Sequence, residues 1–423
     1  MSPAARAGYQ GYLRERGVPT LVAAGLIGRV PDVLVPTALL LLVSRNGDYL
    51  RGGTVVGVWS LTVALVTPFW GRMLSRRGRP QPRLIVLAAA QGLALTALWA
   101  LNIPSARTAV LILATALTAA VAPPVTAVAR NLMNTRFRDS PLRARAFAVE
   151  GAVSEIVVVA GTAAGAALAS MTATMALVFA GGVRLIGVLA LALPSVTGTG
   201  YVPQASAAPS PDDLERLTEA GASAQGVTAA GRSGRSAVLV LLAAVGLLLA
   251  ATGALEIGLV ALGVQLGGDW SGWLLTTFAV AGVLGSLASA RISERFPTPK
   301  LLPLSCCVLA LGALMLAAGP ALSAVELVGL AVALGTCLGA ASTLQLDALG
   351  RLAPEGAGLQ VFSWVGTVSY ASLAGGTLLG GATREAIGSW GIAVLAAGFA
   401  LLAAVASANG HGHGHGRVPA GGQ

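Results

Sequence analysis

Charged residues are scarce in this sequence. Of its 423 residues only 10% are Asp, Glu, Lys or Arg, 55% are hydrophobic, and the mean hydropathy is +0.78. A soluble domain carries about 25% charged residues. The composition therefore excludes an ordinary soluble protein and predicts a helical protein that crosses a membrane several times.

Groups that hold metals or cofactors are scarce too. All three histidines lie in the tract 411–415, and the three cysteines fall in apolar runs without metal-ligand spacing. The sequence has no phosphate-binding Gly-Lys-Ser/Thr loop and no cluster of His, Asp or Cys at one membrane interface. We therefore expect no metal, no cofactor and no enzymatic activity.

Long hydrophobic runs are what the sequence does have. A membrane-spanning helix needs about 20 mostly apolar residues, and twelve such runs are found. The predicted spans are 18–44, 53–73, 84–103, 108–129, 147–169, 171–193, 237–266, 270–290, 301–319, 322–346, 358–382 and 387–408. The expected fold class is an all-α polytopic membrane protein, with twelve transmembrane helices in two pseudo-symmetric six-helix bundles.

Arginine marks one side of these spans. Most of the 27 basic residues lie near the chain ends or in alternate loops, whereas the remaining loops hold only Arg45, Arg51, Arg107 and Arg384. Positive charge marks the loops that are not translocated, so both termini are predicted to be cytoplasmic. Lys300 is the only lysine, which indicates a GC-rich bacterial genome and hence a bacterial plasma membrane. Orientation in the bilayer explains the net charge of +10 better than nucleic-acid binding does.

An internal repeat divides the chain into two halves. Segment 147–154 aligns with 362–369, and 161–165 aligns with 376–380 at the same offset. The predicted units are an N-terminal six-helix bundle over 1–194, a flexible cytoplasmic linker over 195–236, a C-terminal six-helix bundle over 237–408, and a disordered His/Gly-rich tail over 409–423. Two parallel repeats of this kind place a binding site between them, near the bilayer midplane.

The loop between the second and third spans carries the clearest family signal. Gly71, Arg76, Gly78 and Arg79 fit the pattern Gly-x-Leu-x-Asp-Arg-x-Gly-Arg-Arg/Lys, and the chain resembles the major facilitator superfamily of secondary transporters over its whole length. The resemblance implies that this loop gates the inner mouth of the transporter. Ser75 departs from the pattern, because it stands where the family has the aspartate of the gating charge network.

Other pieces bear on the branch of the family. The stretch 161–166 is similar to the Gly-Pro-x-x-Gly-Gly pattern of drug-efflux antiporters, but it lacks the proline and one glycine. The family's arginine in the middle of the fourth helix has no clear match, since Arg130 sits at the end of the predicted span. The pieces 29–31, 253–256 and 351–356 resemble those of uncharacterised actinobacterial transporters.

Charges at membrane depth are costly and are therefore candidate functional groups. Arg29 and Asp32 lie roughly 16–21 Å into the first span, and their i,i+3 spacing puts them on one face. Pro31 and Pro36 interrupt the same helix. One interpretation is that Asp32 binds a proton or a cationic substrate and that Arg29 sets the pKa of Asp32. The other interpretation is that the two residues form a structural ion pair at a kink in the helix.

The fifth span contains two carboxylates. Glu155 either exchanges protons in the interior or pairs with Arg184 of the sixth span. Glu150 lies closer to the cytoplasmic edge and is expected to pair with Arg143 or Arg145.

Glu256 is the candidate carboxylate of the C-terminal half. It lies in the seventh span, which lines the central cavity in the family that the chain resembles. No basic residue of the same span would neutralise it. Glu256 is therefore a candidate for protonation during transport.

Two Gly-x-x-x-Gly motifs occupy equivalent places in the repeat. Gly161 and Gly165 lie in the fifth span, and Gly376 and Gly380 lie in the eleventh. Such motifs let helices approach closely. They are candidates either for hinges on which the two halves rock or for tight packing alone.

Together these features predict a secondary active transporter that works by alternating access and exports a small organic, amphipathic molecule in exchange for protons. Its expected partners are the lipid bilayer, a small-molecule substrate and protons, and it is expected to be a monomer. The alternatives are a sugar or amino-acid permease, and a non-transporting membrane sensor or scaffold on the same fold.

Overall fold

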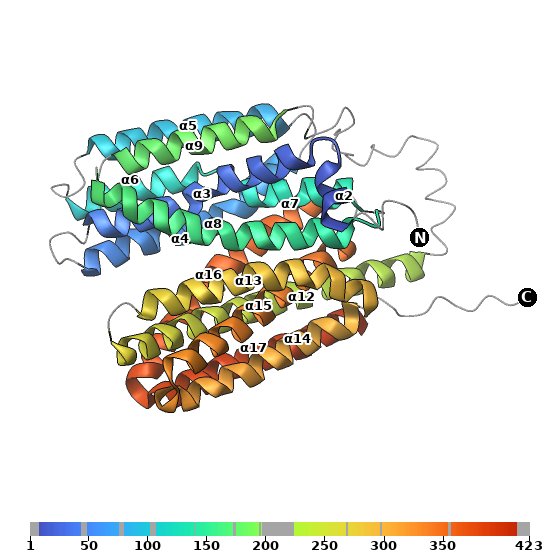
Figure 1. Ribbon diagram of the computed structural model, residues 1–423. Helices are drawn as coiled ribbons and strands as arrows, with labels where there is room; N and C mark the ends of the chain where they lie inside the picture. The colour runs from blue at the N-terminus through green and yellow to red at the C-terminus, as the bar shows by residue number, and fades with distance from the viewer. Residues whose placement is uncertain are drawn as a thin grey trace, which may run out of the picture.

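Helices form the whole regular structure of the described chain. The computed structural model describes residues 8–43, 49–75, 80–101, 107–138, 140–171, 175–193, 196, 224–267, 270–296, 298–353 and 357–412. Within these ranges every regular element is an α-helix or a 3₁₀-helix. The helices gather into two bundles, one from each half of the chain (Figure 1).

The N-terminal half is drawn in blue to green in Figure 1. Its helices are α2 (Gly8–Arg14), α3 (Val18–Val43), α4 (Tyr49–Ser75), α5 (Pro80–Ala100), α6 (Thr108–Ala120), α7 (Val125–Arg136), α8 (Arg143–Met171) and α9 (Met175–Leu191). Helices α6 and α7 together form one span that is broken at Pro123 and Pro124. Proline lacks the backbone N–H that a continuous helix needs there.

The C-terminal half runs from yellow-green to red in Figure 1. Its helices are α12 (Ala224–Leu266), α13 (Trp270–Arg295), α14 (Thr298–Leu314), η3 (Met315–Ala321), α15 (Ala324–Leu352), α16 (Gly358–Ile387) and α17 (Ser389–Gly412). A capping box starts α15, because Ser323 accepts a hydrogen bond from the Glu326 backbone N–H and the Glu326 carboxylate accepts one from the Ser323 backbone N–H.

The twelve predicted spans correspond to these helices. By length and composition, ten candidate spans are found in the described chain, with α6 and α7 counted as one and α14 and η3 as another. The other two are α9, a shorter apolar helix, and α16, which has 30 residues but is rich in Gly, Ser and Thr. Since α16 packs against helices of both halves, its polar composition fits a place between them.

The two halves repeat the same packing. Helix α8 packs on α3 as α16 packs on α12, α9 packs on α3 and α5 as α17 packs on α12 and α14, and α4 packs on α6 as α13 packs on α15. The predicted pseudo-symmetric pair of six-helix bundles is therefore confirmed.

The glycine motifs pack helices within each half. A Cβ atom added at Gly161 would lie 2.7 Å from Cβ of Val33 on α3, and one added at Gly376 would lie 2.1 Å from the carbonyl oxygen of Ala250 on α12. Gly165 likewise faces α3, and Gly380 faces α12. The interpretation of these glycines as the contact on which one half rocks against the other is therefore wrong, because the close approach is between neighbours in one bundle.

Two boundaries of the predicted units differ from the helix ends in the structure. Helix α12 begins at Ala224, inside the predicted linker, and continues to Leu266. Helix α17 runs to Gly412, past the predicted end of the last span. The rest of the predicted linker, apart from Val196, and residues 413–423 of the predicted tail lie outside the described residues.

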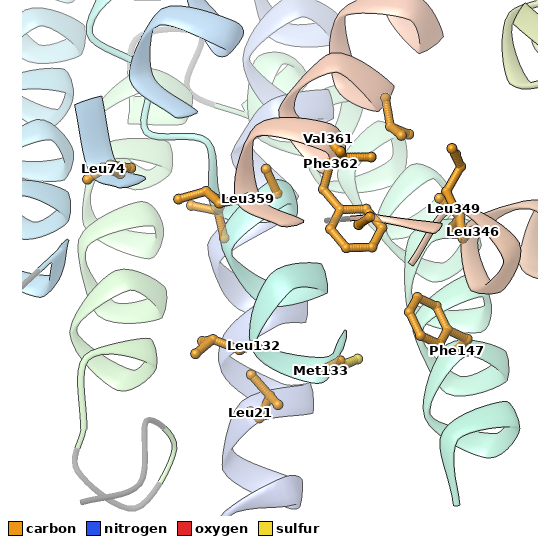
Figure 2. Close-up of a cluster of buried hydrophobic side chains, with 14 of the residues drawn as sticks. Leu21, Leu74, Leu132, Met133, Phe147, Leu346, Leu349, Leu359, Val361 and Phe362 are labelled. Carbon is orange, nitrogen blue, oxygen red and sulfur yellow. The ribbon is translucent and has the colours of Figure 1, made fainter. Parts of the chain in front are cut away.

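One buried cluster joins the two halves. The cluster lies at one end of the two bundles, the end at which α2, Arg143 and Asp347 lie. We call this end of the molecule the N-terminal face. Both halves contribute apolar side chains to this cluster (Figure 2). The first half contributes Leu21, Leu74, Leu132, Met133 and Phe147, and the second half contributes Leu346, Leu349, Leu359, Val361 and Phe362. The rings of Phe147 and Phe362 are 6.4 Å apart between their centroids.

Away from this face, the buried clusters are separate. One runs through the N-terminal half from Leu34 to Ala180, and another belongs to the C-terminal half from Leu248 to Ala404. Apolar packing therefore holds the halves together at the N-terminal face, whereas each half has its own core toward the opposite face.

Candidate functional site

A charged network bridges the halves at the N-terminal face. Arg143, at the start of α8, donates from Nε to Oδ1 of Asp347 on α15 at 2.7 Å and from Nη2 to Oδ1 of Asn134 at 2.8 Å. Arg351 binds the other oxygen of Asp347 at 3.0 Å. The guanidinium of Arg143 also lies 4.9 Å from the ring centroid of Phe147. Because Arg143 and Asp347 are both buried, this ion pair is a specific joint between the halves.

A second set of contacts reinforces the joint. Arg145 on α8 pairs with Glu294 on α13 at 2.5 Å. The hydroxyl of Tyr9 on α2 donates to the carbonyl of Leu287 on α13, and the guanidinium of Arg291 lies 5.8 Å from the Tyr9 ring centroid. The short helix α2 thus reaches across to the C-terminal half.

The predicted gating loop is only partly described. Gly71 lies where α4 meets α16 of the other half, since a Cβ atom there would lie 2.2 Å from Oγ of Ser363. Arg76, Gly78 and Arg79 lie outside the described residues. The Ser75 hydroxyl donates to the carbonyl of Gly71 on its own helix.

Contacts between the halves are concentrated toward the N-terminal face. Besides the joint, they include the Thr367 hydroxyl, which donates to the carbonyl of Ala64 at 2.6 Å, and the approach of Gly151 to Ser286 and Thr343. The described chain is therefore closed at the N-terminal face.

A buried ion triad lies inside the N-terminal half. Oε1 of Glu150 on α8 forms an ion pair with Nη1 of Arg29 on α3 at 2.7 Å and accepts a hydrogen bond from Nε of Arg130 on α7 at 2.9 Å. Oε2 of Glu150 accepts from Nη2 of Arg29 at 2.9 Å. The Glu150 side chain is fully buried, so its two arginine partners compensate a charge that is expensive at this depth. The expectation that Glu150 pairs with Arg143 or Arg145 is therefore wrong.

Asp32 belongs to a separate ion pair. Its Oδ1 accepts from Nη2 of Arg184 on α9 at 2.5 Å, and Nη1 of Arg184 donates to the carbonyl of Gly28 at 2.6 Å. Arg184 is fully buried, whereas the Asp32 side chain is 16% exposed. Arg29 and Asp32 thus do not pair with each other, because each of them reaches a different neighbouring helix. Arg184 is the partner of Asp32 and not of Glu155.

Glu155 and Glu256 come from opposite halves. Glu155 reaches from α8 to α13, where a Cβ atom added at Gly282 would lie 3.3 Å from its Cδ. Glu256 lies on α12, near enough for its charge to act on Glu155. Both residues are half-buried. Among the described residues, neither carboxylate makes a hydrogen bond or an ion pair, so this acidic pair lacks the compensation that Glu150 and Asp32 have.

Sequence reasoning misses the importance of three residues of this site. The predicted span ends near Arg130, but α7 continues to Arg136, which puts Arg130 within the buried part of the span. Glu150, predicted near the cytoplasmic edge, is fully buried, and no sequence pattern singles out Tyr370 of α16. Tyr370 lies near Asp32 and near three buried arginines, which are Arg29, Arg130 and Arg184. A signal was available for Arg130 and Glu150, since both are charged residues in apolar surroundings.

The described residues offer no preformed metal centre. In that part of the chain, no group of three or more His, Cys, Asp or Glu side chains is placed to hold a metal ion. What the interior does offer is a set of arginine–carboxylate pairs and one uncompensated acidic pair, arranged between two symmetric bundles.

Several solved structures share this fold. A bacterial homologue of the iron transporter ferroportin, in an outward-facing state, has a TM-score of 0.67 at 15% identity, with 94% of this chain and 100% of that chain covered. The human organic anion transporter MFSD10 has a TM-score of 0.67 at 17% identity, with 92% and 99% covered. The Escherichia coli fucose:proton symporter has a TM-score of 0.64 at 15% identity, with 93% and 98% covered.

Sequence comparisons point the same way. No curated protein sequence matches the chain. The sequence model of the Major Facilitator Superfamily matches residues 22–377, which is most of the chain. The twelve helices in two symmetric bundles, the structural neighbours and this match agree, and the chain belongs to the Major Facilitator Superfamily.

Proposed function

We propose that the protein is a proton-coupled secondary transporter that exports a small organic, amphipathic molecule by alternating access. Membrane transport itself is what the family and its fold support. The proton coupling is supported by one observation, the acidic pair of Glu155 and Glu256. An uncompensated carboxylate inside a membrane protein is costly, and binding a proton removes that cost.

The position of the acidic pair suits a coupling role. Glu155 belongs to the N-terminal half and packs against Gly282 of the C-terminal half, while Glu256 belongs to the C-terminal half. Any movement of one half against the other changes the surroundings of both carboxylates. Protonation can therefore bias the equilibrium between two arrangements of the halves, as a coupled transporter requires.

The described state fits one end of this cycle. Most arginines lie on the side of the N-terminal face, which supports a cytoplasmic position for that face and for both termini. Closure at this face by Arg143, Asp347, Arg145 and Glu294 would then correspond to an outward-facing state. The cycle would break these pairs and close the opposite face. In this proposal the protein works as a monomer in a bacterial plasma membrane.

Export is the direction that the drug-efflux pattern around 161–166 supports. An inward proton gradient drives export when proton uptake from outside and substrate release to the outside occur in the same state. The proton and the substrate then move in opposite directions, which can be measured without knowing the natural substrate.

The test is proton movement in proteoliposomes that contain the pH dye pyranine. Four compounds represent the substrate classes: cyclohexylmethylammonium, cyclohexanecarboxylate, glucose and alanine. A transported compound added outside should drive protons out of the lumen and raise its pH, beyond the change seen in protein-free liposomes. Acidification of the lumen would contradict export and indicate a permease.

The matched variant is the double substitution Glu155→Gln, Glu256→Gln. It keeps the size and polarity of both side chains and removes their charge, so we expect the compound-driven pH change to be lost. Retention of the full pH change in this variant would contradict the proposed role of the acidic pair.

A further inference from the structure

We infer that the transported molecule carries an acid group and that Arg130 on α7 binds it between the two halves. The inference deepens the proposed function and rests on transport through this interior, but it depends neither on the direction of transport nor on proton coupling. It starts from the charge of the buried triad.

The triad contains more positive than negative charge. Two guanidinium groups, Arg29 and Arg130, share the single carboxylate of Glu150. Arg130 contacts Glu150 and Ser154, and Arg29 contacts Glu150. Glu155 is not among these contacts, since its side chain turns toward Gly282 on α13. Among the described residues, one positive charge of the triad therefore lacks a counter-ion, which is costly at membrane depth.

Arg130 is the member of the triad that a ligand can reach. Its side chain is 10% exposed, compared with 3% for Arg29 and 0% for Glu150. Its Nε is bound to Glu150, and its Nη2 donates to Oγ of Ser154 over a long 3.3 Å. Among the described residues no partner is found for Nη1. The two terminal nitrogens thus form a fork with spare donor capacity, the geometry that binds a carboxylate or phosphate through two parallel hydrogen bonds.

The triad itself holds a further unused donor. Nε of Arg29 is buried without a hydrogen-bond partner in the described chain, as is Nε of Arg184 in the neighbouring pair with Asp32. Tyr370 comes from α16 of the C-terminal half and lies within electrostatic range of Arg130, Arg29 and Arg184. A tyrosine hydroxyl can donate to an acid group. An anion on Arg130 would therefore be held from both halves, with excess positive charge and spare donors around it.

Direct binding tests the inference. Purified protein in nanodiscs is titrated with cyclohexanecarboxylate, with cyclohexanemethanol and with cyclohexylmethylammonium, and its thermal unfolding is followed by tryptophan fluorescence. These probes share one ring and differ in charge. The carboxylate should raise the midpoint of unfolding, and the alcohol and the ammonium should not. Equal stabilisation by the ammonium, or no stabilisation by the carboxylate, would overturn the inference.

Variants locate the binding to Arg130. Arg130→Gln should weaken carboxylate binding about tenfold or more, as expected for the loss of hydrogen bonds to a charged group, whereas Arg384→Gln at the far end of α16 should leave it unchanged. If Arg130→Gln does not fold, Arg130→Lys keeps the charge and loses the fork, and it should still bind the carboxylate several-fold more weakly. Wild-type affinity in either folded Arg130 variant would overturn the inference.

The outcome is separable from that of the proposed function. Carboxylate binding in nanodiscs and compound-driven proton movement in proteoliposomes are measured separately on the wild-type protein, so neither result depends on the other. If the carboxylate does not bind but compounds still drive proton movement, the acid site on Arg130 is contradicted and the proton coupling is not. If the carboxylate binds but no compound drives proton movement, the proton coupling is contradicted and the acid site is not.

Discussion

At the scale of single residues, the interior charges differ in how completely they are compensated. Glu150 accepts two hydrogen bonds, one from each of two arginines, and Asp32 is paired with Arg184 at 2.5 Å. Glu155 and Glu256 have no such partner among the described residues. Compensated charges hold helices together, whereas uncompensated charges are available to bind something. This difference separates the pair of Asp32 and Arg184, which holds α3 on α9, from Glu155 and Glu256, which are available to bind protons.

The pair of Asp32 and Arg184 gives a prediction at this scale. Asp32→Asn leaves a fully buried arginine without its counter-ion, and removing one partner of a buried pair costs about 3–5 kcal/mol. Thermal unfolding in nanodiscs should therefore show a clearly lower midpoint for Asp32→Asn. The double variant Asp32→Asn, Arg184→Leu should recover most of the loss. Glu385→Gln, at an exposed position, is the control and should change little.

A different result would reassign Asp32. If Asp32→Asn unfolds at the wild-type temperature but loses compound-driven proton movement, Asp32 is a proton site and the arginine pairing is incidental. The interpretation of Asp32 as a structural partner would then be contradicted.

The sequence predicts which residues of the site matter better than it predicts their partners. Arg29, Asp32, Glu155 and Glu256 stand out because each is a charge in an apolar run. Their partners lie on other helices, and long arginine side chains reach across to them. Spacing along one helix suggested that Arg29 and Asp32 belong together, whereas the packing of α3 between α8 and α9 separates them. The pairing of Glu155 with Glu256 depends on how the two halves meet, which no local pattern encodes.

At the scale of helices, close approach through glycine holds each bundle together. A Cβ atom at Gly376 would lie 2.1 Å from the Ala250 carbonyl, whereas one at the adjacent Gly375 would meet nothing within 4 Å. Neighbouring glycines of one helix thus have opposite surroundings. This makes them a matched pair for a test of packing.

We expect alanine to lower the stability of the protein at Gly376 but not at Gly375. Gly376→Ala should push α16 away from α12 and lower stability by about 1–3 kcal/mol, the usual cost of overpacking. Gly375→Ala should be neutral or slightly stabilising, because alanine favours a helix more than glycine does. The midpoint of thermal unfolding measures both. Equal effects of the two substitutions would show that α16 does not pack on α12 through Gly376.

Helix positions were largely predictable at this scale, and helix ends were not. Hydropathy identifies an apolar run such as 237–266, because the run must cross the bilayer. It does not detect a helix that continues beyond the apolar run, and α12 begins at Ala224, inside the predicted linker. Likewise α7 continues to Arg136, beyond the apolar part of its span.

At the scale of the whole molecule, the joint at the N-terminal face decides which state is populated. Arg143, Asp347 and Arg351 form its charged part, and the cluster around Phe147 and Phe362 forms its apolar part. Asp347→Asn removes the carboxylate that both arginines share. Loss of a buried pair costs about 3–5 kcal/mol, enough to shift a two-state equilibrium about a hundredfold or more.

This shift can be observed by double electron–electron resonance. Spin labels are placed at Val110 and Ile387, two exposed positions near the opposite face, one in each half, after replacement of Cys306, Cys307 and Cys337. Asp347→Asn should increase the population with a short distance between the labels, because the protein opens at the N-terminal face and closes at the other. Glu385→Gln serves as the control. An unchanged distance distribution in Asp347→Asn would mean that the joint does not determine the state.

The same pair of labels gives the most direct measurement of the central claim, that protonation of Glu155 and Glu256 moves the halves. In the wild-type protein, lowering the pH from about 8.5 to about 5.5, a range that covers the protonation of buried carboxylates, should increase the short-distance population. Glu155→Gln with Glu256→Gln mimics the protonated pair and should show the short-distance population at every pH. A double variant that follows pH as the wild-type protein does would contradict the account.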